Sequence, residues 1–177
     1  MSTAEITREL VPTGTWKVDP SHSAVEFAVK HMMIATVKGR FADFEAVLVG
    51  GDEPSLEGTI GVASADTGDE DRDAHLSAPD FFDAERFPRA RFVATRIDPE
   101  RVVGELTLKG VTREIELDAS WTGSGTDPWG NERIGLELEG EIDRTEYGLV
   151  WNQPLPTGGF LVDDRVKLLA SFSLVKA

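Results

Sequence analysis

The sequence contains no cysteine, so disulfides, thiolate zinc sites and a cysteine nucleophile are all excluded. It has no apolar run that approaches the roughly 20 residues of a membrane-spanning helix, and residues 1–16 carry acids where a signal peptide is apolar. Basic residues are also scarce, 18 against 32 acidic ones, which gives a net charge of −14. Such a surface repels nucleic-acid phosphates and anionic lipid headgroups, and the sequence shows no local basic patch. We expect a cytoplasmic protein with no nucleic-acid partner and no stable membrane insertion.

Hydrophobic residues, in contrast, make up 40% of the 177 residues, enough to bury a substantial core in one domain. The first 14 residues are polar and broken by Pro12 and Gly14, which predicts a flexible N-terminal lead-in. The β-strand pattern begins after Trp16. We therefore predict a lead-in over residues 1–14 and a single β-rich domain over residues 15–177.

Eight segments alternate apolar and polar residues, the pattern of a strand with one buried and one wet face. In the first of them, Val25, Phe27 and Val29 alternate with Glu26 and Lys30. The segments are residues 23–31, 37–49, 56–62, 91–97, 102–108, 112–121, 134–144 and 166–175. This repetition indicates an antiparallel sheet that buries its inner face against itself. We predict an all-β protein built as an eight-stranded antiparallel barrel, which fits slightly better than a two-sheet sandwich.

A helical insert is expected at about residues 66–87, between the two β-rich halves. Five acids between Asp66 and Asp73 suit the positive end of a short helix. His75 lies four residues after Asp71, a spacing typical of a helix pair. The insert is therefore predicted to cap the barrel, with the adjacent aromatics Phe81 and Phe82 turned toward the apolar interior.

Small residues on the presumed inner faces bear on whether the interior is open or packed. They can leave room for a ligand, or they can serve tight bends and bulges in a solid core. The sequence supports these two alternatives about equally. The residues are Gly39, Gly58, Ala94, Gly104, Ala119, Gly140 and Ala170.

Several motifs, taken in their order along the chain, resemble the YceI-like polyisoprenoid-binding proteins. They are Trp16-Lys-Val-Asp19-Pro-Ser-His22, Val37-Lys-Gly39-Arg-Phe41, Arg72-Asp-Ala-His75-Leu76, Asp80-Phe81-Phe82-Asp83, the segment 104–112, and Arg144 with Tyr147-Gly148 and Trp151. The resemblance spans about residues 15–176. It implies a lipocalin-like barrel with a long apolar tunnel that binds a polyisoprenoid, a quinone tail or a related amphiphile, often in a homodimer. Ser77 stands where many members carry a basic residue, which weakens any claim of a cationic headgroup contact there.

The apolar face of each predicted strand, together with the aromatics of the insert and of the loop before the last strand, gives the predicted ligand-binding residues. Trp129, in a Gly/Pro loop, could lie at the rim of a pocket. The predicted ligand-binding residues are Val25, Phe27, Val29, Phe41, Phe44, Ile60, Phe81, Phe82, Phe92, Leu106, Leu117, Leu138, Trp151 and Phe172.

Catalytic and metal-binding patterns are not found. The histidines His22, His31 and His75 are too far apart to form a His-x-x-x-His motif, and no Gly-x-Ser-x-Gly or phosphate-cradling glycine pattern occurs. We predict no catalytic residue, no metal and no cofactor, and a function in carriage, storage or sequestration of a long-chain apolar lipid. Two alternatives stay open: a lipid-acting enzyme that uses Arg72, His75 and nearby aspartates, or a solidly packed structural or interaction barrel.

Overall fold

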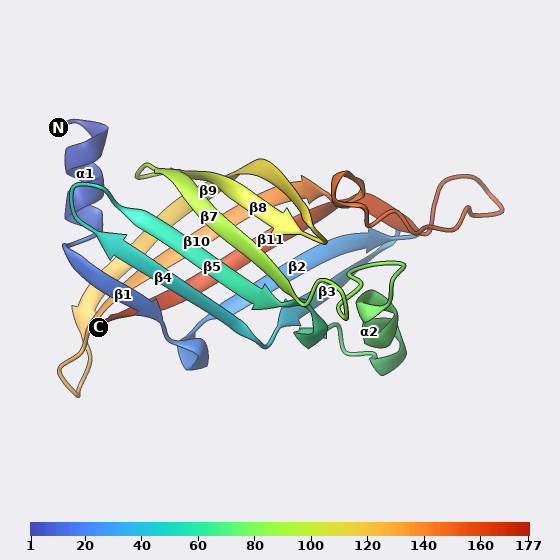
Figure 1. Ribbon diagram of the computed structural model, residues 1–177, viewed down its shortest axis with the longest axis horizontal. Coiled ribbons are helices and arrows are strands. Elements are labelled where there is room, and N and C mark those ends of the chain that lie inside the picture. Colours follow the sequence, from blue (N-terminus) through green and yellow to red (C-terminus); the bar gives the residue numbers. More distant parts are fainter.

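The computed structural model describes residues 1–177 and shows a closed antiparallel β-barrel (Figure 1). Eight strands form the ring, which closes because β1 pairs with both β4 and β11. In order around the ring they are β1 (Gly14–Val18), β4 (Phe44–Gly50), β5 (Ser55–Gly61), β7 (Arg89–Ile97), β8 (Arg101–Leu108), β9 (Val111–Thr126), β10 (Glu132–Asp143) and β11 (Val162–Lys176). The predicted eight-stranded barrel is confirmed, and the sandwich alternative is wrong.

The strands that make up the ring differ from the predicted set. The sequence did not predict β1, whose five residues are too short to show an alternation. The first predicted strand is β2 (Ala24–His31), which lies outside the ring and pairs with β11 and β3 (Ala35–Phe41). The predicted strand 37–49 is broken between Phe41 and Phe44 into β3 and β4. With the two-residue β6 (Ala65–Asp66), β2 and β3 extend the wall beyond the ring.

The long strands show why the alternation was readable. In β10, Ile134, Leu136 and Leu138 are buried, whereas Glu137 and Glu139 face solvent. Leu138 lies between Ala119 of β9 and Ala170 of β11, so a large inner side chain faces small ones across both ladders. This inward and outward alternation on neighbouring strands places one dry face around the whole interior.

The N-terminal segment has regular structure. Residues Thr3–Leu10 form α1, whose N-terminus has a capping box in which Ser2 and Glu5 exchange side-chain and backbone hydrogen bonds. Val11, directly after the helix, is 1% exposed, and the Trp16 indole donates to the Pro12 carbonyl oxygen at 3.0 Å. The segment predicted as a flexible lead-in thus contains a helix, and its end is part of the core; its flexibility stays a prediction.

The second helix, α2 (Glu70–Ser77), lies inside the predicted insert. Asp69 caps it by accepting from the Arg72 backbone N–H, and three acids occupy its first turn, as the helix dipole favours. Neither helix has the length or the apolarity that crossing a bilayer requires. Three single-turn helices complete the chain: η1 (Pro20–His22), η2 (Val62–Ser64) and η3 (Arg144–Tyr147).

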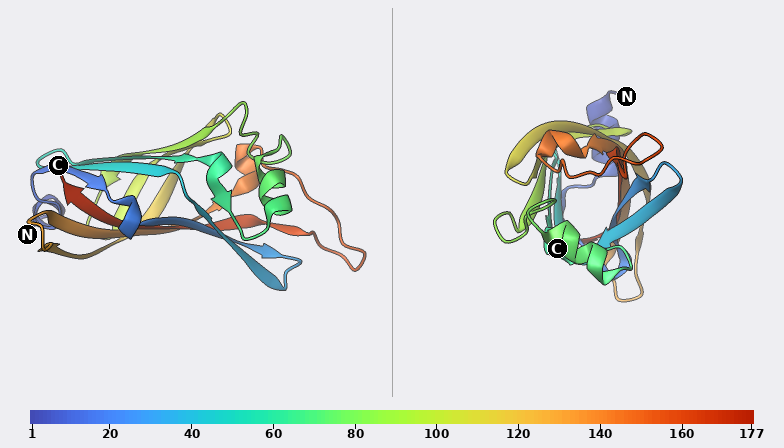
Figure 2. Two further views of the ribbon diagram at one scale, coloured as in Figure 1. Left: turned by 90° about the horizontal axis from the view of Figure 1, so that it is seen from below. Right: turned by 90° about the vertical axis from the view of Figure 1, so that its right-hand side faces the viewer.

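The core consists of two clusters at the two ends of the barrel. We call the first the packed end; it includes Val11, Trp16, Leu48, Leu136 and Leu174, and it lies beside α1 and the C-terminus (Figures 1 and 2). We call the second the cavity end, where α2 and the long loop between η3 and β11 are found (Figures 1 and 2). Its buried residues are Phe41, Val62, Ala65, Phe81, Phe82, Ala90, Leu108, Ile142, Tyr147 and Leu149.

Candidate functional site

An apolar cavity of about 220 Å³ lies inside the barrel, and residues of both core clusters line it. Hydrophobic residues account for 24 of the 30 that line it. An apolar cavity of roughly 150 Å³ already stays dry and admits a ligand such as benzene. The interior is therefore large enough, and apolar enough, to hold an apolar guest.

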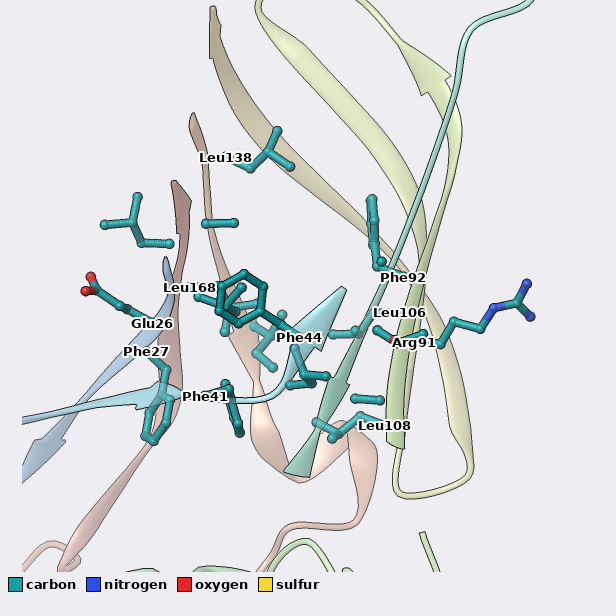
Figure 3. Close-up of a pocket in the computed structure, with 18 of the residues that line it drawn as sticks. Glu26, Phe27, Phe41, Phe44, Arg91, Phe92, Leu106, Leu108, Leu138 and Leu168 are labelled. Atoms are coloured by element: carbon teal, nitrogen blue, oxygen red, sulfur yellow. The ribbon is translucent and has the colours of Figure 1, made fainter. Parts of the chain in front are cut away.

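The walls are formed by the inner faces of the strands. Phe44, Leu106 and Leu168 face the enclosed space from different sides of the barrel (Figure 3). The side chains of Glu26 and Arg91 point away from it, so these residues contribute only their backbone side to the wall (Figure 3). The charges of Glu26 and Arg91 thus lie outside the barrel, as the cost of burying an unpaired charge requires.

Only one of the glycines named above as inner-face residues has room for a Cβ without a clash. A Cβ on Gly39 would overlap the Phe27 ring, and a Cβ on Gly104 would overlap the Phe92 ring, so neighbouring aromatics already fill these two positions. Gly58 differs, because its Cβ would meet only Glu45 O at 3.4 Å and the Ala46 side chain at 3.6 Å. The question that the sequence left open has a split answer: Gly39 and Gly104 accommodate a neighbouring ring, whereas Gly58 leaves room for a Cβ.

A lid of aromatic residues covers the cavity end. Phe81 and Phe82 are 7% and 9% exposed and both line the cavity. The Phe82 ring packs edge-on against Phe41 at 6.0 Å, and Phe81 lies 5.5 Å from the Trp151 ring. His75 packs edge-on against both Phe81 and Trp151, at 5.0 and 4.7 Å between ring centroids. The insert thus caps the barrel, with both phenylalanines turned inward.

The polar groups of the insert hold it in place and do not converge on a common point. Arg72 donates from Nε to Thr67 Oγ1 at 2.6 Å and from Nη2 to Thr67 O at 2.8 Å, while Asp73 accepts from Thr67. His75 Nε2 lies 3.2 Å from Asp80, so the predicted pairing with Asp71 is wrong. Because the side chain of Arg72 is committed to Thr67 and that of His75 to the lid, the arrangement offers no acid–base pair facing the cavity.

A buried arginine at the cavity end was not recognised from the sequence as anything more than a motif residue. Arg144 is 4% exposed and lines the cavity, and its burial lowers the pKa of its guanidinium. Its nitrogens donate to four backbone oxygens: Asp163 O (2.8 Å), Leu149 O (2.6 Å), Trp151 O (3.0 Å) and Val162 O (3.2 Å). A fifth contact, at 3.6 Å, is to the Asp164 carboxylate. Arg144 therefore fastens the two ends of the loop before β11, and four of its five N–H donors are bonded to backbone oxygens. The only signal was a lone arginine ahead of the uncharged stretch 147–162.

Of the fourteen predicted ligand-binding residues, twelve line the cavity and two do not. Val29 lies further along β2, paired with Val166 and Val37, and Trp151 packs behind the lid against His75 and Phe81. Direct contact with a ligand stays a prediction for all fourteen. Trp129 is 82% exposed in the β9–β10 turn beside the packed end, so its expected place at a pocket rim is wrong. The prediction left out further apolar lining residues, among them Leu56, Leu76, Leu108, Ile115, Ile142, Leu149, Val166 and Leu168.

Comparison with known proteins places this barrel in a family. A family model described as the YceI-like domain matches residues 16–174. The chain belongs to the YceI-like family. A UPF0312 protein of Staphylococcus epidermidis is 39% identical to this YceI-like chain over 158 residues, covering 86% of this chain and 92% of the relative. The resemblance drawn from the motifs is confirmed.

Solved structures share the YceI-like fold. BcnA of Burkholderia cenocepacia has 27% sequence identity and a TM-score of 0.75, covering 90% of this chain and 99% of that chain. A domain from Saccharophagus degradans, described as polyisoprenoid-binding and implicated in plant cell wall breakdown, has 14% identity and a TM-score of 0.68. It covers 92% of this chain and 98% of that one, and at this identity the likeness shows the fold alone.

Proposed function

We propose that this protein binds a long-chain apolar lipid, such as a polyisoprenoid, a quinone tail or a related amphiphile, inside the barrel for carriage, storage or sequestration. The observation that carries the proposal is the enclosed cavity of about 220 Å³ with 24 hydrophobic lining residues. The solid packed end stops a guest on one side, and the aromatic lid covers it on the other. The family and its structural neighbours likewise indicate a binding protein rather than an enzyme.

The magnitude of apolar burial favours a long tail as the ligand. Burial of a methylene group contributes about 0.8 kcal/mol, so about 15 buried carbons supply on the order of 12 kcal/mol. Immobilising the ligand costs roughly 4–15 kcal/mol. Useful affinity therefore requires that most of the tail be enclosed, which a short apolar molecule cannot achieve in this site.

The lining also defines which part of the lipid is bound. The Arg91 side chain points away from the interior (Figure 3), and four of the five N–H donors of Arg144 are bonded to backbone carbonyls, with the Asp164 carboxylate 3.6 Å away. Arg144 is therefore committed to the protein and poorly placed to compensate a buried phosphate. A charged headgroup buried there would lose its hydration without compensation, so we infer that the tail enters and the head stays outside.

Filling the cavity tests the proposal directly. Gly58→Phe places a ring in the one open inner-face position, and we expect it to reduce uptake of a fluorescent prenyl or long-chain acyl probe by about tenfold or more. The matched control is Gly125→Phe, because Gly125 has nothing within 4 Å of its Cβ and lies in the β9–β10 hairpin outside the cavity. Probe fluorescence and native mass spectrometry of co-purified lipid are the readouts.

The results separate three cases. Loss of uptake in Gly58→Phe with normal uptake in Gly125→Phe supports the proposal. Equal uptake by the wild type and Gly58→Phe contradicts binding in this cavity. A wild-type protein that carries no lipid and takes up neither probe would identify the barrel as a structural or interaction module instead.

A further inference from the structure

The cavity end carries most of the exposed large hydrophobic side chains of the protein. Eight such side chains are exposed, and five of them lie in the β2–β3 turn and the loop between η3 and β11. The most prominent are Met33 (70% exposed), Ile34 (81%) and Phe160 (60%). We call Met32, Met33, Ile34 and Phe160 the apolar tip. Its two segments meet where the Met32 N–H donates to Leu161 O at 2.8 Å.

The turn that presents the tip is held in an unfavourable backbone conformation. Met32 and Met33 have φ angles of 54° and 60°, in the left-handed region that β-hairpin turns normally fill with Asn or Gly. Two methionines there cost backbone strain and also expose apolar surface to water. Methionine is unbranched and flexible, and it is common on surfaces that bind irregular apolar partners. Because neither the strain nor the exposed apolar surface stabilises the fold, we attribute both to a role of this turn in binding.

The charge distribution around the tip is opposite to that of the protein. The whole chain has a net charge of −14, yet residues 27–42 contain Lys30, Lys38 and Arg40 and no acid. Residues 147–162, which include Phe160, carry no Asp, Glu, Lys or Arg at all. Asp163 and Asp164 follow directly, so the tip itself is uncharged and lies between these acids and the basic residues of β2 and β3. It is therefore repelled less by a negatively charged partner than the net charge of −14 suggests.

Three lysines gather on the outer wall behind the tip. Strand pairing sets Lys167 of β11 opposite Ala28 of β2, and Ala28 opposite Lys38 of β3. The side chains of Lys167 and Lys38 therefore lie on the same face of the sheet as that of Ala28. Lys30 lies on this face too, two residues further along β2 toward the tip. All three lysines are exposed, and none forms an ion pair. This basic patch, which Glu26 and Glu141 border, could not be recognised from the sequence, because Lys38 and Lys167 are far apart in the chain and only the register brings them together.

We propose that the apolar tip docks reversibly on the surface of an anionic phospholipid bilayer. Met33, Ile34 and Phe160 enter the interface, and Lys30, Lys38 and Lys167 pair with headgroups, the arrangement of a peripheral anchor. The apolar tip comprises four side chains, whereas a stable protein interface takes roughly 20–30 residues a side, so a bilayer fits better than a second copy. The docking goes beyond the proposed cavity function and does not depend on it.

Vesicle binding is the test. Large unilamellar vesicles of phosphatidylcholine with phosphatidylglycerol, and of phosphatidylcholine alone, are sedimented with the full-length protein at low and high salt. We expect binding to the anionic vesicles that weakens with salt. The double variant Met33→Asp/Ile34→Asp is expected to bind the anionic vesicles at least about tenfold more weakly. The double variant Lys30→Gln/Lys38→Gln is expected to lose mainly the salt-dependent part of the vesicle binding.

The matched control is Trp129→Asp, which removes an equally exposed hydrophobic side chain at the packed end and should leave vesicle binding unchanged. Thermal melts check that each variant is folded, with Ile34→Ser as a milder replacement. Uptake of a probe added without vesicles should be normal in the tip variants, which separates this proposal from the cavity function. Two results would overturn the proposal: wild-type strength binding by the Met33→Asp/Ile34→Asp variant, or a wild-type dimer in sedimentation that the same variant dissociates without any vesicle binding.

Discussion

The two ends of the barrel are made from the same alternating strands but are filled in opposite ways. At the packed end, Leu48, Leu136 and Leu174 have no exposed surface. At the cavity end, Phe44, Leu106 and Leu168 face an enclosed space (Figure 3). An eight-stranded barrel has an interior that side chains can fill or that can hold one small ligand. In this chain side chains fill one end, and a cavity remains at the other. The difference shows that the apolar pattern of a strand determines which face is buried, and not what it is buried against.

Polar groups follow the same division. Arg133 bridges Asp19 and Asp127 with contacts of 2.9 Å, which joins the end of β1 to the β9–β10 hairpin at the packed end. At the cavity end, the long loop before β11 has no charged residue, and Arg144 fastens it through backbone carbonyls. Side-chain ion pairs of Arg133 join segments at the packed end, whereas at the cavity end backbone carbonyls hold an uncharged loop that presents apolar side chains to its surroundings.

We expect the two ends to differ most in the unfolding free energy that is lost when a leucine is truncated to alanine. Leu136→Ala removes a side chain with no exposed surface from the packed end and should cost about 2–5 kcal/mol of unfolding free energy. Leu106→Ala should cost less, roughly 2 kcal/mol or below, because one side of Leu106 already faces the cavity and makes fewer contacts. Urea unfolding of both variants measures the difference. Equal losses would show that the cavity end is packed as tightly as the packed end.

A pair of glycine substitutions sharpens the comparison within the barrel wall. Gly104→Ala should destabilise the fold by about 1–3 kcal/mol, because the new methyl group would overlap the Phe92 ring and the Val93 carbonyl oxygen. Gly58→Ala should instead stabilise it by about 0.5–1 kcal/mol, since the methyl group fits at ordinary van der Waals distances and the unfolded chain loses entropy. Opposite signs in urea unfolding are the expected outcome. A loss of stability in both variants would mean that Gly58 does not border free space.

The smallest effect concerns acid sensitivity at the packed end. For Asp127, burial raises the pKa, but hydrogen bonds from Asn131, Arg133 and Trp129 outweigh it and lower the pKa to about 2. Hydrogen bonds from Ser21, His22 and Arg133 lower the pKa of Asp19 as well. A carboxylate with a lowered folded-state pKa stabilises the fold above its unfolded pKa of about 4, and this contribution is lost as the pH falls through the folded value.

Arg133→Met should therefore lower the melting temperature at pH 7, and the gap from the wild type should close as the pH is taken from about 4 toward 2. Circular dichroism melts across this range measure the gap. Melting curves that stay parallel down to the lowest pH would exclude Arg133 as the partner that makes these carboxylates acid-sensitive.

Much of the fold could be predicted because its signals are local. Val25 and Phe27 on β2, or Ile134 to Leu138 on β10, reveal a buried face within a few residues, and the acids before Ala74 reveal a helix start. The short strand β1 could not be found this way, although it closes the ring. The helix α1 was not predicted, because residues 1–14 are polar and are broken by Pro12 and Gly14, although Ser2 and Glu5 form a capping box at the helix start.

The candidate site was predictable to a similar degree. Twelve of the fourteen predicted residues line the cavity because inner-face alternation extends over every wall strand. Val29 falls outside it because alternation gives the face of a strand but not the depth along the barrel at which the cavity lies. Trp151 falls outside it because it lies in a loop and packs behind the lid against His75 and Phe81. The role of Arg144 was hidden for a related reason, since its four acceptors come from a loop whose path only the folded chain defines.

The sequence by itself determined the strand pattern, the apolar inner face, the capping insert and the family. The tertiary structure alone decided where that inner face is filled and where it is hollow, because this depends on how side chains of paired strands are turned. Phe92 is paired opposite Gly58, yet its ring lies over Gly104, so a Cβ on Gly58 would meet only Glu45 O and Ala46. The tertiary structure also decided that Lys38 and Lys167 stand together behind the apolar tip. Both outcomes depend on pairings between distant strands, and free space and charge clusters are properties of such neighbours, not of any single stretch of chain.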